Sequence, residues 1–260
     1  LGLVGSEMCI RDSSYITVCG DAALKTAGKI EKDVRNGNIT GPLQGVPYAV
    51  KDQFWTKGIL TTGGAKILDD FVPGKNATVV QRLNDAGGVL LGKLNMSEFA
   101  TGNSVYHHWG TPRNPWDLDR NPGTSSSGSG AATAAFLCAT SLGEDTGGSG
   151  RGPASYCGVV GLRPTFTRVS RYGMTRMCWF MDAASPMTKT VEDCALMLSV
   201  IAGYDDKDPY TSRRPVPDYT ATIRQGVKGL RLGLIKELHE TNDMHPDVRA
   251  AIDSSLDTFR

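Results

Sequence analysis

The residues of this chain best suited to chemistry form the run Thr146-Gly147-Gly148-Ser149. Successive glycines let neighbouring backbone N–H groups point into one concavity, which binds an anion or a developing oxyanion. Ser149 ends the run, so its hydroxyl would lie beside these donors as a nucleophile. The run therefore indicates either acyl transfer to a serine or simple anion binding.

A serine nucleophile needs a base, and the four histidines lie at no spacing typical of a catalytic base or a metal ligand. Lysine is the remaining candidate, because burial lowers the pKa of an amine and lets it accept a proton near neutral pH. Lys51 follows the apolar segment Val46–Val50 and can point from a strand end into a cleft. An exposed lysine is the commoner outcome at such a position.

The segment Asn121–Pro153 is rich in glycine and serine, a composition most often typical of a flexible linker. The alanine-rich segment Gly130–Ala139 interrupts it and predicts a buried helix, which a linker does not contain. Two serine-bearing turns, at Ser125 and Ser149, flank this helix and a following strand. We therefore expect the two turns to converge on one site.

A second glycine motif, Gly87–Lys93, has the spacing of a phosphate-binding P-loop. However, Leu94 occupies the position where a serine or threonine binds magnesium. The interior residues Val89–Leu91 predict a strand rather than an exposed cradle of amides, so we interpret the motif as structural.

Five motifs follow one another in a fixed order. They are Gly45-Val-Pro-Tyr-Ala-Val-Lys51-Asp52, Thr61-Thr62-Gly63, Pro122-Gly-Thr-Ser125-Ser-Ser-Gly-Ser, Asp145-Thr-Gly-Gly-Ser149-Gly-Arg-Gly-Pro-Ala154 and Cys157-Gly-Val-Val-Gly-Leu-Arg-Pro164. Together they resemble the amidase signature family, and the match runs from about Ser14 to Arg260.

The resemblance implies a Ser–cis-Ser–Lys triad that hydrolyses amides. By motif position Lys51 is the lysine, Ser125 the serine with the cis peptide bond, and Ser149 the nucleophile. The backbone amides of Thr146, Gly147, Gly148 and Ser149 would form the oxyanion hole, and Ser126, Asp145 and Arg151 would support the site. The alternative interpretation of Asp145 and Arg151 is that both are ordinary surface charges. The resemblance implies no metal and no organic cofactor.

Three positions, Thr124, Ser127 and Gly150, depart from the residues usual in the family. None of them removes a member of the triad.

Apolar segments separated by glycine and proline predict alternating helices and strands. The predicted helices are Asp21 to about Gly37, Ala77–Ala86, Gly130–Ala139, Val191–Ala202 and Pro246–Arg260, and the predicted strands are Val46–Val50, Val89–Leu91, Ser141–Gly143, Val159–Leu162 and Leu230–Ile235. Asp205–Thr220 is interpreted as a surface loop. The predicted fold class is α/β, with a mixed sheet covered by helices as in the amidase signature fold, incomplete at its C-terminal end.

The chain has 260 residues, 40% of them hydrophobic, and a formal net charge of +1. This composition excludes a disordered chain and favours neither nucleic acid nor an anionic membrane as a partner. The six cysteines are scattered, which argues against a zinc site and a disulfide scaffold. No apolar run approaches the ~18 residues of a membrane span, and we expect a cytoplasmic protein.

The two ends of the chain carry separate expectations. Residues 1–13 resemble a non-native assembly scar or a disordered tail, and residues 14–260 are expected to be the N-terminal part of an amidase signature domain. Pro246–Arg260 has an apolar stripe with nothing following to pack against it, so we expect a fragment truncated within a longer domain.

The leading hypothesis is an amidohydrolase that cleaves the C–N bond of a small carboxamide through an acyl-enzyme. Such an enzyme would act alone or as a homodimer. The alternative is the glutaminase subunit of a tRNA-dependent amidotransferase, which would need partner subunits. A third hypothesis, from another class, is a non-catalytic anion-binding protein. We expect no direct contact with nucleic acid and none with membranes.

Overall fold

The structure is a computed structural model that describes residues 13–101, 107–241 and 243–259. Apart from Ser13, the suspected N-terminal scar lies outside the described residues. The chain divides into two compact units, Leu1–Ile223 and Arg224–Arg260. All residues of the candidate site belong to the first unit. No helix in the described part of the chain is long and apolar enough to cross a membrane.

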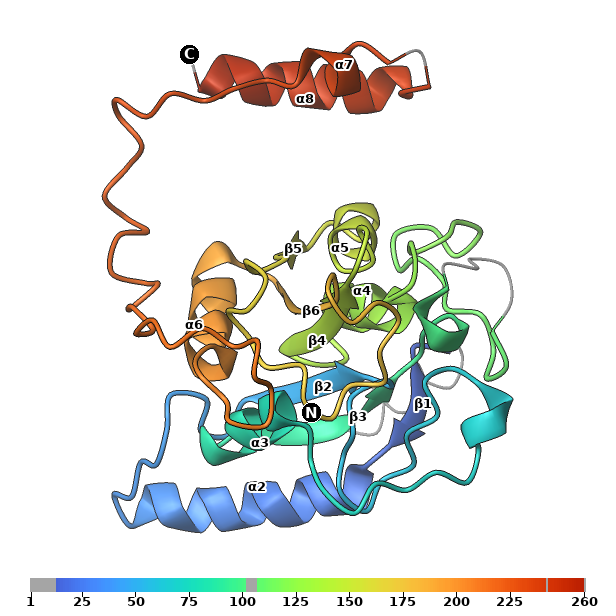
Figure 1. Cartoon of the computed structure of the whole chain (residues 1–260), viewed down its shortest axis with the longest axis vertical. Helices are drawn as coiled ribbons and strands as arrows, with labels where there is room; N and C mark the ends of the chain where they lie inside the picture. Colours follow the sequence, from blue (N-terminus) through green and yellow to red (C-terminus); the bar gives the residue numbers. More distant parts are fainter. Residues whose placement is uncertain (1–12, 102–106, 242, 260) are drawn as a thin grey trace. The chain divides into compact units, whose positions relative to one another are not determined.

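The first unit is built on a six-stranded sheet with the order β1-β3-β2-β4-β6-β5 (Figure 1). Its strands are β1 (Tyr15–Val18), β2 (Pro47–Lys51), β3 (Val89–Leu94), β4 (Thr140–Asp145), β5 (Val160–Gly161) and β6 (Ala183–Thr188). The β2 strand runs parallel to both β3 and β4, and the other neighbouring strands pair antiparallel. The predicted α/β class with a mixed sheet is therefore confirmed.

Helices cover this sheet (Figure 1). They are α2 (Gly20–Arg35), α3 (Thr78–Asp85), α4 (Ser127–Ala134), α5 (Arg151–Tyr156) and α6 (Val191–Ile201), with two short 3₁₀ helices at Lys66–Leu68 and Glu98–Ala100. The α2 helix packs against β3, α4 against β4 and α5, and α6 against β6 and α3. The second unit contains α7 (Lys236–His239) and α8 (Pro246–Thr258).

The alternation of side chains along β2 decides which way Lys51 points. Tyr48 and Val50 join the core that α3 and α6 cover, whereas Ala49 packs with Ala132 of α4. Residues two apart on a strand lie on the same face of the sheet. Lys51 is therefore directed to the same side as Ala49, toward α4.

The α4 helix begins earlier and is shorter than predicted. The sequence predicted Gly130–Ala139, but the helix spans Ser127–Ala134, and every one of its residues is buried. Phe136 has a φ of 58°, a left-handed conformation that ends the helix before the rest of the predicted segment. The prediction of a buried helix was right, and its boundaries were wrong because the apolar residues continue past the turn.

The predicted strand Leu230–Ile235 does not form. No described residue pairs with this segment, and Leu230 and Leu232 are exposed. A run of alternating apolar residues becomes a strand only where a neighbour supplies backbone hydrogen bonds. Conversely, β6 was not predicted, because Pro186 interrupts it and its strand conformation depends on pairing with the distant β4 and with β5. The β1 strand and the short α5 helix were also missed.

Gly128 allows α4 to lie directly against the backbone just after β3 and just before β1. Its N–H donates to the carbonyl of Asn95 over 2.9 Å, and the N–H of Asn95 donates to the carbonyl of Ser14, also over 2.9 Å. A Cβ on Gly128 would lie 2.6 Å from the backbone nitrogen of Asn95, and closer still to the carbonyl oxygen of Ser14. The backbone contact leaves no room for a side chain.

This close approach predicts opposite effects for two glycine-to-alanine substitutions within helices. Gly128→Ala should lower the free energy of unfolding by about 1–3 kcal/mol, because backbone atoms must move apart. Gly28→Ala, in α2 with nothing within 4 Å of the added Cβ, should raise it by up to ~1 kcal/mol through helix propensity. Urea denaturation of the two variants measures both effects, and equal effects would contradict the packing argument.

Candidate active site

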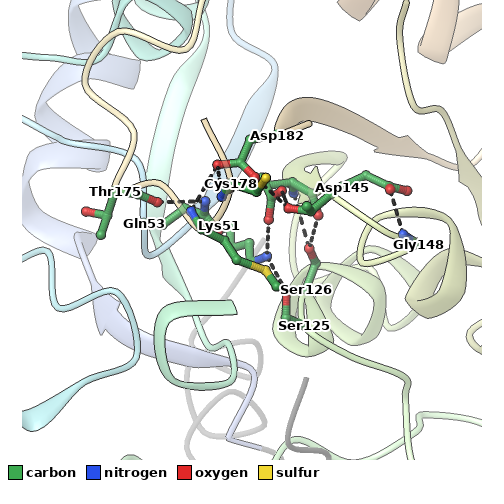
Figure 2. Close-up of polar contacts among 12 residues, drawn as sticks. Lys51, Gln53, Ser125, Ser126, Asp145, Gly148, Thr175, Cys178 and Asp182 are labelled. Atoms are coloured by element: carbon green, nitrogen blue, oxygen red, sulfur yellow. Dashed lines mark hydrogen bonds and ion pairs between the residues drawn. The ribbon is translucent and has the colours of Figure 1, made fainter. Parts of the chain in front are cut away.

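Lys51 lies at the carboxyl end of β2 and is completely buried. Its Nζ donates a hydrogen bond to Ser125 Oγ over 2.7 Å and a second to Glu144 Oε2 over 3.0 Å (Figure 2). Ser125 immediately precedes the turn into α4, and Glu144 lies near the carboxyl end of β4. Because β2 and β4 are parallel neighbours, their carboxyl ends meet at the same edge of the sheet and bring these groups together.

The surroundings lower the pKa of the Lys51 amine below its ordinary value of 10.5. Burial is the largest cause, because it penalises the charged form. The charge and hydrogen bond of Glu144, and the charges of Asp182 and Asp145, offset part of this effect. The amine is therefore easier to deprotonate than an exposed lysine and can exchange a proton with Ser125.

Ser126 connects the turn before α4 with the end of β4 and with the loop that carries Ser149. Its Oγ donates to the carbonyl of Glu144 over 3.1 Å and accepts from the N–H of the same residue over 3.2 Å. Its N–H donates to the carbonyl of Ser149 over 3.2 Å. The preceding peptide bond, Thr124–Ser125, is cis. The two serine-bearing turns thus lie side by side, as the sequence analysis expected.

Asp145 supports the loop between β4 and α5. Its buried carboxylate accepts from the N–H of Gly148 over 2.8 Å (Figure 2). It also accepts from Nε of Arg151 over 2.9 Å. Burial alone would raise the pKa of this carboxyl, but the hydrogen bonds from Arg151 and Gly148 outweigh it and lower the pKa. Asp145 is therefore an internal anion and not a surface charge, and Arg151 covers it from the solvent side.

The backbone N–H groups of this loop are of two kinds. One donates to a side chain of the protein, and others have no acceptor in the described part of the chain. The N–H of Gly148 points to Asp145 and is not available to a ligand. Among the described residues, the N–H groups of Gly147 and Ser149 have no acceptor. Ser149 itself is half-buried, at the beginning of the approach to α5.

Two residues that the sequence analysis did not select, Glu144 and Asp182, are part of the same cluster. Glu144 contacts Lys51, and the Thr146 hydroxyl lies 2.6 Å from both Glu144 Oε1 and Asp182 Oδ1. Glu144 directly follows the predicted strand Ser141–Gly143, and no sequence pattern marked it as a partner of Lys51. Asp182 follows the apolar run Trp179–Met181 and belongs to no motif, so only the fold reveals its position.

A second buried lysine, Lys93, stabilises the turn after β2. Its Nζ donates to Thr61 Oγ1 over 2.6 Å and to the carbonyl of Phe54 over 2.8 Å, and it lies 3.3 Å from Asp52 Oδ1. Burial lowers the pKa of Lys93 to about 8, although Asp52 opposes this shift. The prediction that Val89–Leu91 forms a strand instead of a P-loop is confirmed, because Lys93 lies within β3 itself.

The part of the chain that the structure describes has no group of three or more His, Cys, Asp or Glu side chains placed to bind a metal ion. The cysteines Cys138, Cys157 and Cys194 are buried free thiols. The groups that contact the Lys51 amine are the hydroxyl of Ser125 and the carboxyl of Glu144.

Comparisons with known proteins identify the family of the chain. The family model described as Amidase matches residues 10–260. A curated relative from Desulfatibacillum aliphaticivorans, which is the A-type subunit of a glutamyl-tRNA(Gln) amidotransferase, is 48% identical over 95% of this chain and 51% of its own length.

Two solved structures are similar as well. One comes from a vestigial protein complex said to reveal the evolutionary origins of an s-triazine catabolic enzyme. It has a TM-score of 0.89 and 40% identity, and the match covers 94% of this chain and 53% of that one. The other is the native peptide amidase of Stenotrophomonas maltophilia, with a TM-score of 0.78, 42% identity and coverage of 82% and 45%. This chain spans about half the length of the curated relatives it matches. With the family model matching nearly the whole chain, the protein belongs to the amidase signature family.

Proposed function

We propose that this chain carries the Lys51–Ser125–Ser149 machinery of an amidohydrolase that cleaves a carboxamide through an acyl-enzyme. The observation that carries the proposal is the 2.7 Å hydrogen bond between Lys51 Nζ and Ser125 Oγ, both of them fully buried. A buried amine with a lowered pKa next to a hydroxyl is the arrangement that a lysine base requires.

In this mechanism neutral Lys51 accepts the proton of Ser125 as Ser125 takes the proton of Ser149. The Ser149 oxygen then attacks the amide carbonyl and forms a tetrahedral intermediate. Its collapse breaks the C–N bond, and the same relay running in reverse protonates the leaving amine. Water activated by the relay then hydrolyses the ester and restores Ser149.

The N–H groups of Gly147 and Ser149 are the oxyanion donors in this proposal, because both lack an acceptor among the described residues. Thr146 was also predicted as a donor, and its backbone N–H remains part of the proposal. The predicted contribution of the Gly148 N–H is withdrawn, since this group donates to Asp145. Each donor of an oxyanion hole contributes about 3–4 kcal/mol to transition-state stabilisation.

A second candidate is the glutaminase subunit of a tRNA-dependent amidotransferase. The names of the curated relatives favour it. In that case the substrate is the side-chain amide of glutamine, and partner subunits receive the ammonia. The chemistry at Ser149 is the same, so the two candidates differ only in substrate and assembly.

The anion-binding hypothesis has less support. An anion at the Gly147–Gly148 turn would compete with the carboxylate of Asp145 for the N–H of Gly148. A hydrolase explains the buried Lys51–Ser125 pair, whereas anion binding gives it no role.

The first test is covalent labelling with a fluorophosphonate, followed by peptide mass spectrometry. We expect a single adduct on Ser149, because the relay makes this hydroxyl the nucleophile. Ser149→Ala should remove the adduct while leaving the circular dichroism spectrum unchanged. A folded chain that remains unlabelled would refute the proposal.

The second test is the pH dependence of the labelling rate. Only neutral Lys51 accepts a proton, so the rate should fall as the pH drops through the pKa of Lys51, which burial places below 10.5. Lys51→Met should reduce the rate by about 10²–10⁴-fold and remove this pH dependence. Lys93→Met is the matched control, because Lys93 is equally buried but contacts neither serine. Its folded fraction should keep the pH dependence.

The third test compares ammonia release from glutamine with release from simple aliphatic amides. A stand-alone amidohydrolase should favour the simple amides by at least about tenfold in kcat/KM, a difference of ~1.4 kcal/mol in transition-state binding. A preference for glutamine that increases when partner subunits are added would support the amidotransferase candidate instead.

A further inference from the structure

The Thr146 hydroxyl lies between two buried carboxyl groups. Its Oγ1 is 2.6 Å from Glu144 Oε1 and 2.6 Å from Asp182 Oδ1. Glu144 is 0% exposed and Asp182 is 1% exposed, so the protein shields both carboxyl groups from solvent. Both distances are typical of strong O–H···O hydrogen bonds.

Two hydrogen bonds need two protons, and the Thr146 hydroxyl supplies only one of them. A threonine hydroxyl carries a single proton and donates only one hydrogen bond. An ionised carboxylate donates none. If Glu144 and Asp182 were both ionised, one of the two short contacts would join two acceptors with no proton between them. One of the two carboxyl groups therefore supplies a proton.

The remaining contacts identify Asp182 as the protonated group. The second oxygen of Glu144, Oε2, accepts a hydrogen bond from the Lys51 amine, whereas among the described residues Asp182 forms no hydrogen bond or ion pair with a basic side chain. Burial raises the pKa of Asp182, and the negative charge of Glu144 raises it further. The hydrogen bond between Asp182 and Thr146 and those from the N–H groups of Cys178 and Met177 oppose this rise but do not cancel it.

We propose that Asp182 is a buried carboxylic acid that donates to Thr146, whose hydroxyl in turn donates to ionised Glu144, so that the two carboxyl groups together present one negative charge to Lys51. Asp182 and Glu144 are positioning residues in this scheme and touch no reacting atom. Only the consequence for catalysis rests on the proposed function.

That consequence concerns the charges that face Lys51. They are Glu144, Asp182 and Asp145, and Arg151 and Arg163 already neutralise Asp145. With Asp182 protonated, one uncompensated carboxylate remains. Each further anion near an amine raises its pKa and holds it as an ammonium that cannot accept a proton. The proton on Asp182 thus keeps Lys51 usable as a base, while Glu144 still stabilises the ammonium formed during the relay.

The presence of the proton is tested without any activity. Infrared spectra of this chain at neutral pH, unlabelled and with ¹³C-labelled aspartate, should differ in a carboxylic-acid C=O band. The difference spectrum between the wild type and Asp182→Asn should assign that band to Asp182. Absence of an isotope-sensitive acid band would overturn the proposal, and the wild-type comparison does not depend on whether a variant folds.

The effect on Lys51 is tested by the pH dependence of fluorophosphonate labelling. Asp182→Asn should leave the midpoint in place, because a neutral amide that donates to Thr146 replaces a neutral acid. Glu144→Gln should lower the midpoint by about 1 unit or more, because it removes the one charge facing Lys51. An equally large fall in Asp182→Asn would show that Asp182 is ionised and overturn the proposal. If no labelling occurs at all, the proposed function fails, and the infrared band still decides the inference.

Discussion

The burial of the Lys51 amine is the constraint on which the site depends. Removing an ammonium from water costs several kcal/mol even after the protein relaxes, and only well-placed partners offset that cost. Ser125 and Glu144 are those partners, at 2.7 and 3.0 Å. They come from the turn before α4 and from β4, so the helix and both parallel strands must be in register before the amine is satisfied. The same desolvation that opposes stability lowers the pKa of Lys51.

The loop between β4 and α5, which carries Ser149, is held by a second set of contacts. Asp145 binds the loop backbone at Gly148 and the side chain of Arg151, and Ser126 connects the carbonyl of Ser149 to the backbone of Glu144. These bonds hold the loop and leave the N–H groups of Gly147 and Ser149 without an acceptor among the described residues. A site that must stabilise a developing charge benefits from donors that do not reorganise during the reaction. Rigidity here comes from backbone hydrogen bonds more than from apolar packing.

The sequence predicted the parts of the site that short motifs encode. Lys51, Ser125 and Ser149 were selected because each lies in a motif with its own local pattern, and α3 and β2 followed from apolar periodicity. Asp182 and β6 were not predicted, because their roles depend on partners far along the chain. Glu144 was passed over for a similar reason, since a charge within a strand has meaning only beside Lys51. Leu230–Ile235 shows the converse error, an apolar pattern without a neighbouring strand. Local sequence patterns predict local structure, whereas the electrostatic partners of Lys51 are determined only when the sheet has assembled.

The backbone contact at Gly128 has a consequence for how the molecule opens. The carbonyls of Ser14 and Asn95 accept from Asn95 and Gly128 in turn, which connects the approach to β1 with the first turn of α4. Proteins open locally in cooperative units, whose members exchange their amide hydrogens together. Fraying of the segment before β1 would therefore remove the acceptor of the Asn95 N–H and, within one cooperative unit, loosen the Asn95–Gly128 hydrogen bond next to the turn that carries Ser125. The segment before β1 thus helps to hold the turn that carries Ser125, although it contributes no chemical group to the site.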